Sequence, residues 1–120
     1  MFDRLDERVN ADAVLERRSK FLDLAFGLAV GEDRRVIAVR HGRIAAPVPA
    51  GTGAPEPAFS ITVDPAAWAE FCKPMPKPGH HHVMAMVENG HARVEGAMLP
   101  YFTNLYFIMG VLDHARRASA

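Results

Sequence analysis

Alternating apolar residues between Leu22 and Val30 constrain the fold more than any other feature of this chain. Apolar side chains occupy every second position of the segment: Leu22, Leu24, Phe26, Leu28 and Val30. Because successive side chains of a strand point to opposite faces, this spacing predicts a β-strand with one buried face. Gly31, Glu32 and Asp33 then interrupt the pattern, as a hairpin turn does. A sheet is therefore the expected centre of the fold.

Three further strands are expected after this turn, at residues 36–39, 43–48 and 59–63. A turn signal, His41-Gly42, separates the first two of them. The connection 49–57 is rich in Pro and Gly, which favours an exposed position. Because strands joined by short turns pair antiparallel, we expect residues 21–63 to form an antiparallel sheet.

The N-terminal segment, residues 1–20, is predicted to form a helix. Acids and bases alternate there around a few apolar side chains, and either Asn10 or Asp12 can cap a short helix that runs through Arg18. Ion pairs between neighbouring charges on a helix stabilise it only weakly. We interpret these charges as a solvated face.

Residues 64–116 are predicted to contain three helices and the last strand. Asp64 and Pro65 are predicted to start the first helix. The Asp64 carboxylate can accept hydrogen bonds from the unpaired backbone amides of the first turn, and proline already has a helical φ. Three closely spaced prolines end this helix, since proline lacks an amide proton. The remaining elements are a helix at 79–87, a strand at 91–96 and a helix at 99–116.

The last helix is apolar nearly all round. One stripe is expected to face the sheet: Met98, Phe102, Leu105, Met109 and Leu112. The opposite side is also apolar, with Tyr101, Tyr106, Phe107, Ile108 and Val111. A helix of this kind needs a second apolar neighbour, which can be another helix, a second subunit or a ligand.

Length, composition and charge exclude several classes of protein. The 120 residues suffice for one domain, residues 1–120, and 49% hydrophobic residues are typical of a globular chain. The 14 Lys and Arg residues balance 14 Asp and Glu residues, so the chain lacks the positive field of a nucleic-acid-binding protein. We therefore expect no nucleic-acid partner.

The chain shows no signal for export or for a membrane span. Cys72 is the single cysteine, and the N-terminus is charged where a secretory signal is apolar. The longest uncharged apolar stretch, 97–112, is shorter than the roughly 20 residues that a membrane-spanning helix needs. We expect a cytoplasmic protein without a transmembrane segment.

The run His80, His81 and His82 is the one cluster with catalytic potential. Consecutive helical residues diverge by about 100°, so three of them cannot converge on one metal ion. In an extended segment His80 and His82 would share a face, and His91 or His114 could complete a site, but no paired Cys or His spacing supports one. We expect no metal site and no cofactor; if the protein is an enzyme, His80, His81 and His82 are its candidate acid–base residues. The segment Gly51-Thr52-Gly53 lacks the Lys and the helix of a phosphate-binding loop.

Three sequence strings, in this order, resemble the sterol carrier protein 2-like family of lipid-transfer domains. They are FSITVDPAAWAEF at 59–71, KPGHHHVMAMVENGHARVEG at 77–96 and NLYFIMGVLDHAR at 104–116. The resemblance covers roughly residues 15–116. It implies an α+β fold in which helices cover a five-stranded, mainly antiparallel sheet. It also implies an apolar cavity between the sheet and the C-terminal helices.

The resemblance also assigns candidate ligand-binding residues. The expected cavity lining is Trp68, Phe71, Met84, Phe102, Leu105 and Met109. The residues available to orient a polar head are Tyr101, Thr103 and Asn104. We expect non-catalytic binding, and transfer, of a fatty acyl, sterol-like or other lipid molecule. The alternatives are an enzyme that uses the histidine run on an apolar substrate and a homodimeric interaction module; transient membrane contact is a further expectation.

Overall fold

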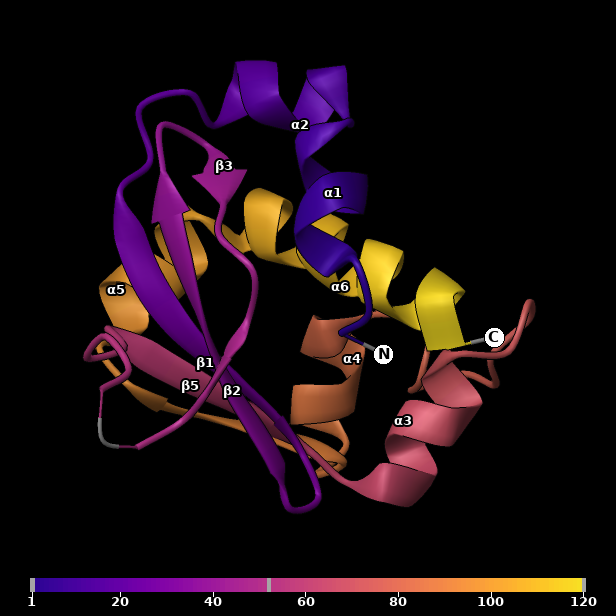
Figure 1. The fold of residues 1–120 in the computed structure, drawn as a ribbon. Helices are drawn as coiled ribbons and strands as arrows, with labels where there is room; N and C mark the ends of the chain where they lie inside the picture. The colour runs from indigo at the N-terminus through magenta and orange to yellow at the C-terminus, as the bar shows by residue number, and fades with distance from the viewer. Residues whose placement is uncertain (1, 52, 120) are drawn as a thin grey trace.

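Figure 1 shows the computed structural model, which describes residues 2–51 and 53–119 and arranges helices along one side of a β-sheet. The helices are α1 (Leu5–Asn10), α2 (Ala13–Arg18), α3 (Pro65–Phe71), α4 (Val83–Glu88), α5 (Met98–Thr103) and α6 (Leu105–Ser119). The strands are β1 (Leu24–Val30), β2 (Asp33–Arg40), β3 (Arg43–Ile44), β4 (Val48–Pro49), β5 (Phe59–Val63) and β6 (Ala92–Gly96). Thr52, the centre of the glycine-flanked segment, lies outside the described residues.

The sheet has the order β3-β2-β1-β5-β6, and β4 pairs with β2 beside β3. Most pairs are antiparallel, as expected, but β1 and β5 at the centre run parallel, with Phe26 opposite Phe59. The reason is the long connection after β4, which returns the chain to the other edge of β1 instead of turning it back on itself. The α+β fold with a mainly antiparallel sheet is confirmed.

The strand predicted at 43–48 is interrupted. Its two ends form β3 and β4, which both pair with β2, whereas residues 45–47 belong to neither strand. Pro47 lies in this gap, and proline has no amide proton to donate to a neighbouring strand. A continuous third strand was therefore a wrong prediction.

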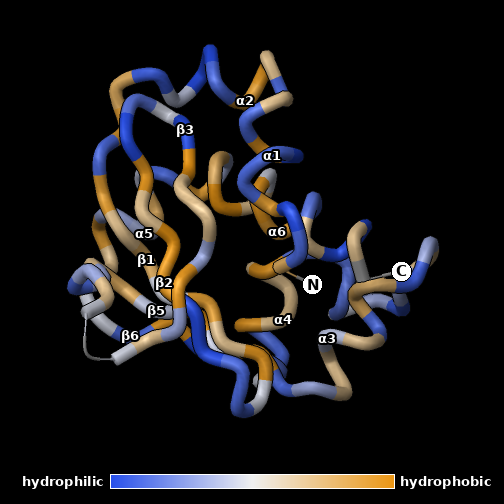
Figure 2. Tube along the Cα trace, viewed as in Figure 1, coloured by the Kyte–Doolittle hydropathy of each residue, from blue (hydrophilic) through white to orange (hydrophobic). Residues whose placement is uncertain are grey.

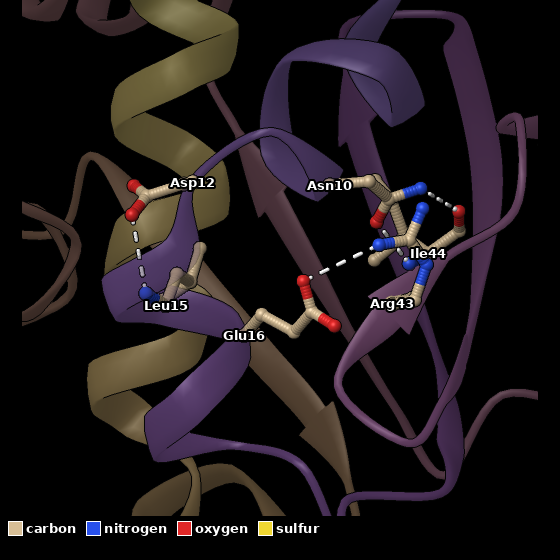
Figure 3. Close-up of polar contacts among 6 residues, drawn as sticks. All are labelled: Asn10, Asp12, Leu15, Glu16, Arg43 and Ile44. Carbon is tan, nitrogen blue, oxygen red and sulfur yellow. Dashed lines mark hydrogen bonds and ion pairs between the residues drawn. The ribbon is translucent and has the colours of Figure 1, made fainter.

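Two short helices replace the single helix predicted for residues 1–20. Asp12 separates them, because its backbone is extended and its carboxylate accepts a hydrogen bond from the amide of Leu15 at 3.1 Å. Asn10 has a different role: its side chain donates to the carbonyl of Ile44 at 2.9 Å and accepts from the Ile44 amide at 2.8 Å. Glu16 pairs with Arg43 at 3.3 Å (Figure 3). The N-terminal helices are thus tied to the β3 edge of the sheet.

Two helix starts differ from the sequence prediction. Pro65 occupies the first position of α3 as expected, but the side chain of Asp64 makes no capping hydrogen bond. Helix α4 begins at Val83 instead of near residue 79, because the ring of His82 caps it by accepting from the Ala85 amide at 3.1 Å. The four residues before Val83 are consequently loop.

The C-terminal helix is divided, and most of its buried residues come from the side opposite to the predicted stripe. Helix α5 ends at Asn104, which donates to the carbonyl of Pro100 at 2.9 Å, and α6 then starts in a new orientation. The buried side chains of α6 are Phe107, Ile108, Val111, Leu112 and Ala115. Phe102 is 58% exposed and Met109 is half-buried, so of the predicted stripe only Leu112 is fully part of the core.

One hydrophobic cluster joins the strands and the helices. It includes Phe26, Ile37 and Ile61 from the sheet and Ile108 from α6, each at most 1% exposed. Figure 2 shows the same arrangement as hydrophobic stretches along β1, β2, α4 and α6. Among the residues that the structure describes, no helix combines the length and the hydropathy that crossing a bilayer requires.

Candidate functional site

An opening lies on the outer side of α6, between α6 and α2. We call it the main cleft; its volume is about 570 Å³. The end of α3 and the start of α4 complete its wall. A volume of this size lies within the range of ligand pockets, roughly 300–1,000 Å³.

The lining of the main cleft combines an apolar base with polar edges. The apolar residues are Val14, Leu15, Phe71, Val83, Met109, Gly110 and Leu112. The polar and aromatic residues are Asp12, Arg18, His81, His82, Tyr106 and Asp113. Most of the apolar group is buried, whereas every member of the polar group is half-buried or exposed. The cleft thus offers an apolar surface to a guest and keeps its charges near water.

Gly110 allows α2 and α6 to approach closely at the base of the main cleft. A Cβ atom at this position would lie 2.8 Å from Cδ1 of Leu15, which is closer than side-chain carbons normally come. The missing side chain therefore leaves room for Leu15 to pack against α6 at the base of the cleft.

A hydrogen bond between Asp12 and His114 joins the start of α2 to α6 at the edge of the main cleft. Nε2 of His114 lies 3.0 Å from Oδ2 of Asp12. The hydrogen bond with His114 and then that from the Leu15 amide hold the pKa of the Asp12 carboxyl below its usual value. The neighbouring Asp113 is paired with Arg117 at 2.8 Å. Both carboxylates at the cleft therefore already have partners.

The lowered pKa of Asp12 makes a testable contribution to acid stability. A carboxylate whose folded pKa is depressed stabilises the fold above its unfolded pKa, about 3.9, and loses that contribution as the pH falls through the folded value. Asp12→Asn retains a good capping residue and removes the charge. We expect the wild type to be more stable than Asp12→Asn at neutral pH, and the gap to narrow below about pH 4. Urea unfolding across this pH range measures the difference in unfolding free energy between the two proteins. A difference that does not change with pH would contradict the prediction.

The three consecutive histidines point to different surroundings. His82 caps α4, and it lines the main cleft together with the exposed His81. His80 stacks on His91 with ring centroids 4.2 Å apart, and its Nδ1 lies 3.4 Å from the carbonyl of Pro78. Within residues 2–51 and 53–119, no group of three His, Cys, Asp or Glu side chains is arranged to hold a metal ion.

The structure brings together only part of the predicted ligand-binding set. Phe71 and Met109 line the main cleft, and Trp68 lies behind Phe71 with ring centroids 5.3 Å apart. Thr103 and Asn104 line a smaller neighbouring opening of about 300 Å³, which we call the side cleft.

The other predicted residues line neither cleft. Tyr101 is 3% exposed and packs edge-on against Phe59, and this burial raises the pKa of its hydroxyl. Leu105 packs against the edge of the core, whereas Phe102 is exposed and Met84 is half-buried on α4. Tyr101 is thus a core residue and not a free polar group.

The opening differs in position from the cavity expected between the sheet and the C-terminal helices. Buried side chains of α6, among them Ile108 and Val111, belong there to the same hydrophobic cluster as the strands. The sequence did not predict the wall formed by α2, because the charges there, among them Arg18, were interpreted as a solvated face and the apolar face with Val14 and Leu15 is narrow. The one available signal was Gly110, since glycine inside a helix often marks a close approach.

No protein-family model matches the chain, and no curated protein matches it. Solved structures do match. A crystal structure of sterol carrier protein 2 aligns with a TM-score of 0.73 and 17% identity, over 97% of this chain and 93% of the other. The solution structure of the Thermus thermophilus protein TT1886 aligns with a TM-score of 0.70 and 18% identity, over 96% and 83%. The ubiquinone synthesis protein UbiJ-SCP2 aligns with a TM-score of 0.60 and 10% identity, over 92% and 88%.

Proposed function

For a chain with this sterol carrier protein 2-like fold, we propose that it binds and carries a hydrophobic small molecule, without covalent chemistry, in the main cleft. The observation that carries the proposal is the cleft itself, whose buried lining is apolar and whose polar groups lie at its edges. The structural neighbour named sterol carrier protein 2 supports lipid binding or transfer in general. Fatty acyl chains, sterol-like rings and similar lipids are the ligand classes that fit an apolar lining.

Binding in such a cleft should be reversible. Burying about ten methylene groups at about 0.8 kcal/mol each gains roughly 8 kcal/mol before the costs of association and ordering. Those costs leave an affinity that permits release, as a carrier requires. An open cleft between two helices also needs no large rearrangement to admit a guest.

The test compares two methionines in a fluorescent fatty-acid binding assay. Met109 lines the main cleft, whereas Met84 is half-buried on α4 and lines neither cleft. We expect Met109→Asp to weaken uptake of cis-parinaric acid by about tenfold or more, because a carboxylate in the apolar lining must be desolvated. Met84→Asp is the matched control and should bind like the wild type.

Intact folding of both variants, shown by circular dichroism, makes the comparison decisive. Unchanged uptake by folded Met109→Asp, or equal loss in both variants, would remove the main cleft as the binding site. Native mass spectrometry of gently purified protein adds an independent readout: a co-purified lipid supports carriage, whereas a ligand-free stoichiometric dimer supports the interaction module.

Two histidines at the cleft favour one alternative, an enzyme that acts on an apolar substrate. His81 is exposed there, and the capping bond of His82 occupies its Nδ1. Of these two histidines, only His81 has a ring that does not cap a helix. A His81→Ala variant whose turnover equals that of the wild type on every substrate found would eliminate this alternative.

A further inference from the structure

We propose that the ligand carries an anionic head, a carboxylate or a phosphate, which is held by Arg18 where the two clefts meet. The inference rests on the proposed function and adds a ligand class to it. The apolar chain of the ligand lies in the main cleft, and its head points toward the side cleft. Arg18 is thus the residue that discriminates anionic from neutral lipids.

The two clefts share three lining residues, Leu15, Arg18 and Tyr106. The guanidinium of Arg18 lies over the ring of Tyr106, with Cζ 5.0 Å from the ring centroid. A guanidinium in a cation–π contact still has several N–H donors that can bind a carboxylate or a phosphate. Arg18 therefore lies at the junction with donors available to an anionic group.

The side cleft has a mixed lining that is more polar than that of the main cleft and contains no acid. Its apolar residues are Leu15, Phe21, Leu22 and Phe107, and its polar side chains are Arg18, Ser19, Thr103, Asn104 and Tyr106, so Arg18 is the one charged group among these lining residues. Hydroxyl and amide groups beside a guanidinium can add hydrogen bonds to an oxyanion. The main cleft, by contrast, has mostly apolar lining. This division of polarity matches an amphiphile with one anionic end.

Nearby acids are committed to other partners. Asp12 pairs with His114, Glu16 with Arg43 and Asp113 with Arg117. In the part of the chain that the structure describes, Arg18 takes part in no ion pair, and its guanidinium lies over the ring of Tyr106. A cation without a protein counterion beside an apolar cleft is available to an anionic ligand.

The test uses competition against Nile red, a neutral apolar probe, by three ligands with one chain: oleate, oleyl phosphate and oleyl alcohol. We expect the wild type to prefer the two anions over the alcohol by about fivefold, the effect of one partly solvated ion pair. Arg18→Gln should remove this preference and leave the affinity for oleyl alcohol unchanged. Added salt should reduce the preference of the wild type, because Arg18 is exposed.

Arg17→Gln is the matched control, since Arg17 is the exposed neighbour on α2 and lines neither cleft. It should retain the preference for anions. Equal binding of oleate and oleyl alcohol by the wild type would overturn the role of Arg18 while leaving the proposed function intact. Loss of the preference in His81→Ala but not in Arg18→Gln would place the head at the opposite end of the main cleft and would also overturn it. If no oleyl compound displaces Nile red, the proposed function itself fails.

Discussion

Phe59→Ala is expected to lower the free energy of unfolding by about 3–5 kcal/mol, because it removes a large side chain from the centre of the core. Phe59 is 1% exposed and stacks on Phe26 with ring centroids 5.7 Å apart. Tyr101 of α5 contacts the same ring edge-on at 5.6 Å. The residue therefore connects the central parallel strand pair to the C-terminal helices, and few neighbours can move to fill the space it leaves.

Urea unfolding followed by circular dichroism measures this effect, and the melting temperature should fall by more than about 10 °C. Phe21→Ala is the control: Phe21 is 87% exposed, so its substitution should change stability by less than about 0.5 kcal/mol. A loss below about 1 kcal/mol in Phe59→Ala would contradict the arrangement of the core described above.

Gly42→Ala is expected to lower the free energy of unfolding by about 2–4 kcal/mol, through left-handed strain and a backbone collision. Gly42 has φ +74 in the two-residue turn between β2 and β3. A Cβ atom there would lie 2.5 Å from the carbonyl oxygen of Ser19, a backbone atom of the segment that follows α2. The amide of Gly42 also donates to the carbonyl of Leu22 at 3.2 Å. The turn therefore holds the segment that follows Arg18.

A substitution at Gly90 distinguishes the left-handed strain from the backbone collision. Its φ is +77, nearly the same as that of Gly42, but a Cβ atom there would have nothing within 4 Å. Gly90→Ala should therefore cost only the conformational strain, about 1–2 kcal/mol. Denaturant unfolding of the two variants gives the difference directly. Equal losses would show that the contact between the turn and Ser19 is unimportant.

Some site residues could be predicted because their role follows from local apolar character. Phe71 and Met109 both belong to helices that the sequence pattern identified, and both line the main cleft. Thr103 and Asn104 also lie beside a cleft, although the break at Asn104 that places them there was not foreseen. The inner face of α6 was predicted only in part, at Leu112, because a helix that is apolar on all sides has no pattern that identifies its inner face.

Local chemistry in the sequence determined which segments form strands and helices, and where several of them end. The alternation at Leu24–Val30, the proline that opens α3 and the glycine that follows α4 each act within a few residues of the chain. Only the tertiary structure decided that β1 and β5 run parallel, that α2 packs on α6, and that Arg18 lies between two clefts. These features depend on contacts between segments as many as about 100 residues apart, such as Asp12 with His114. No local propensity encodes such a contact, because its free energy arises only when both surfaces are already formed.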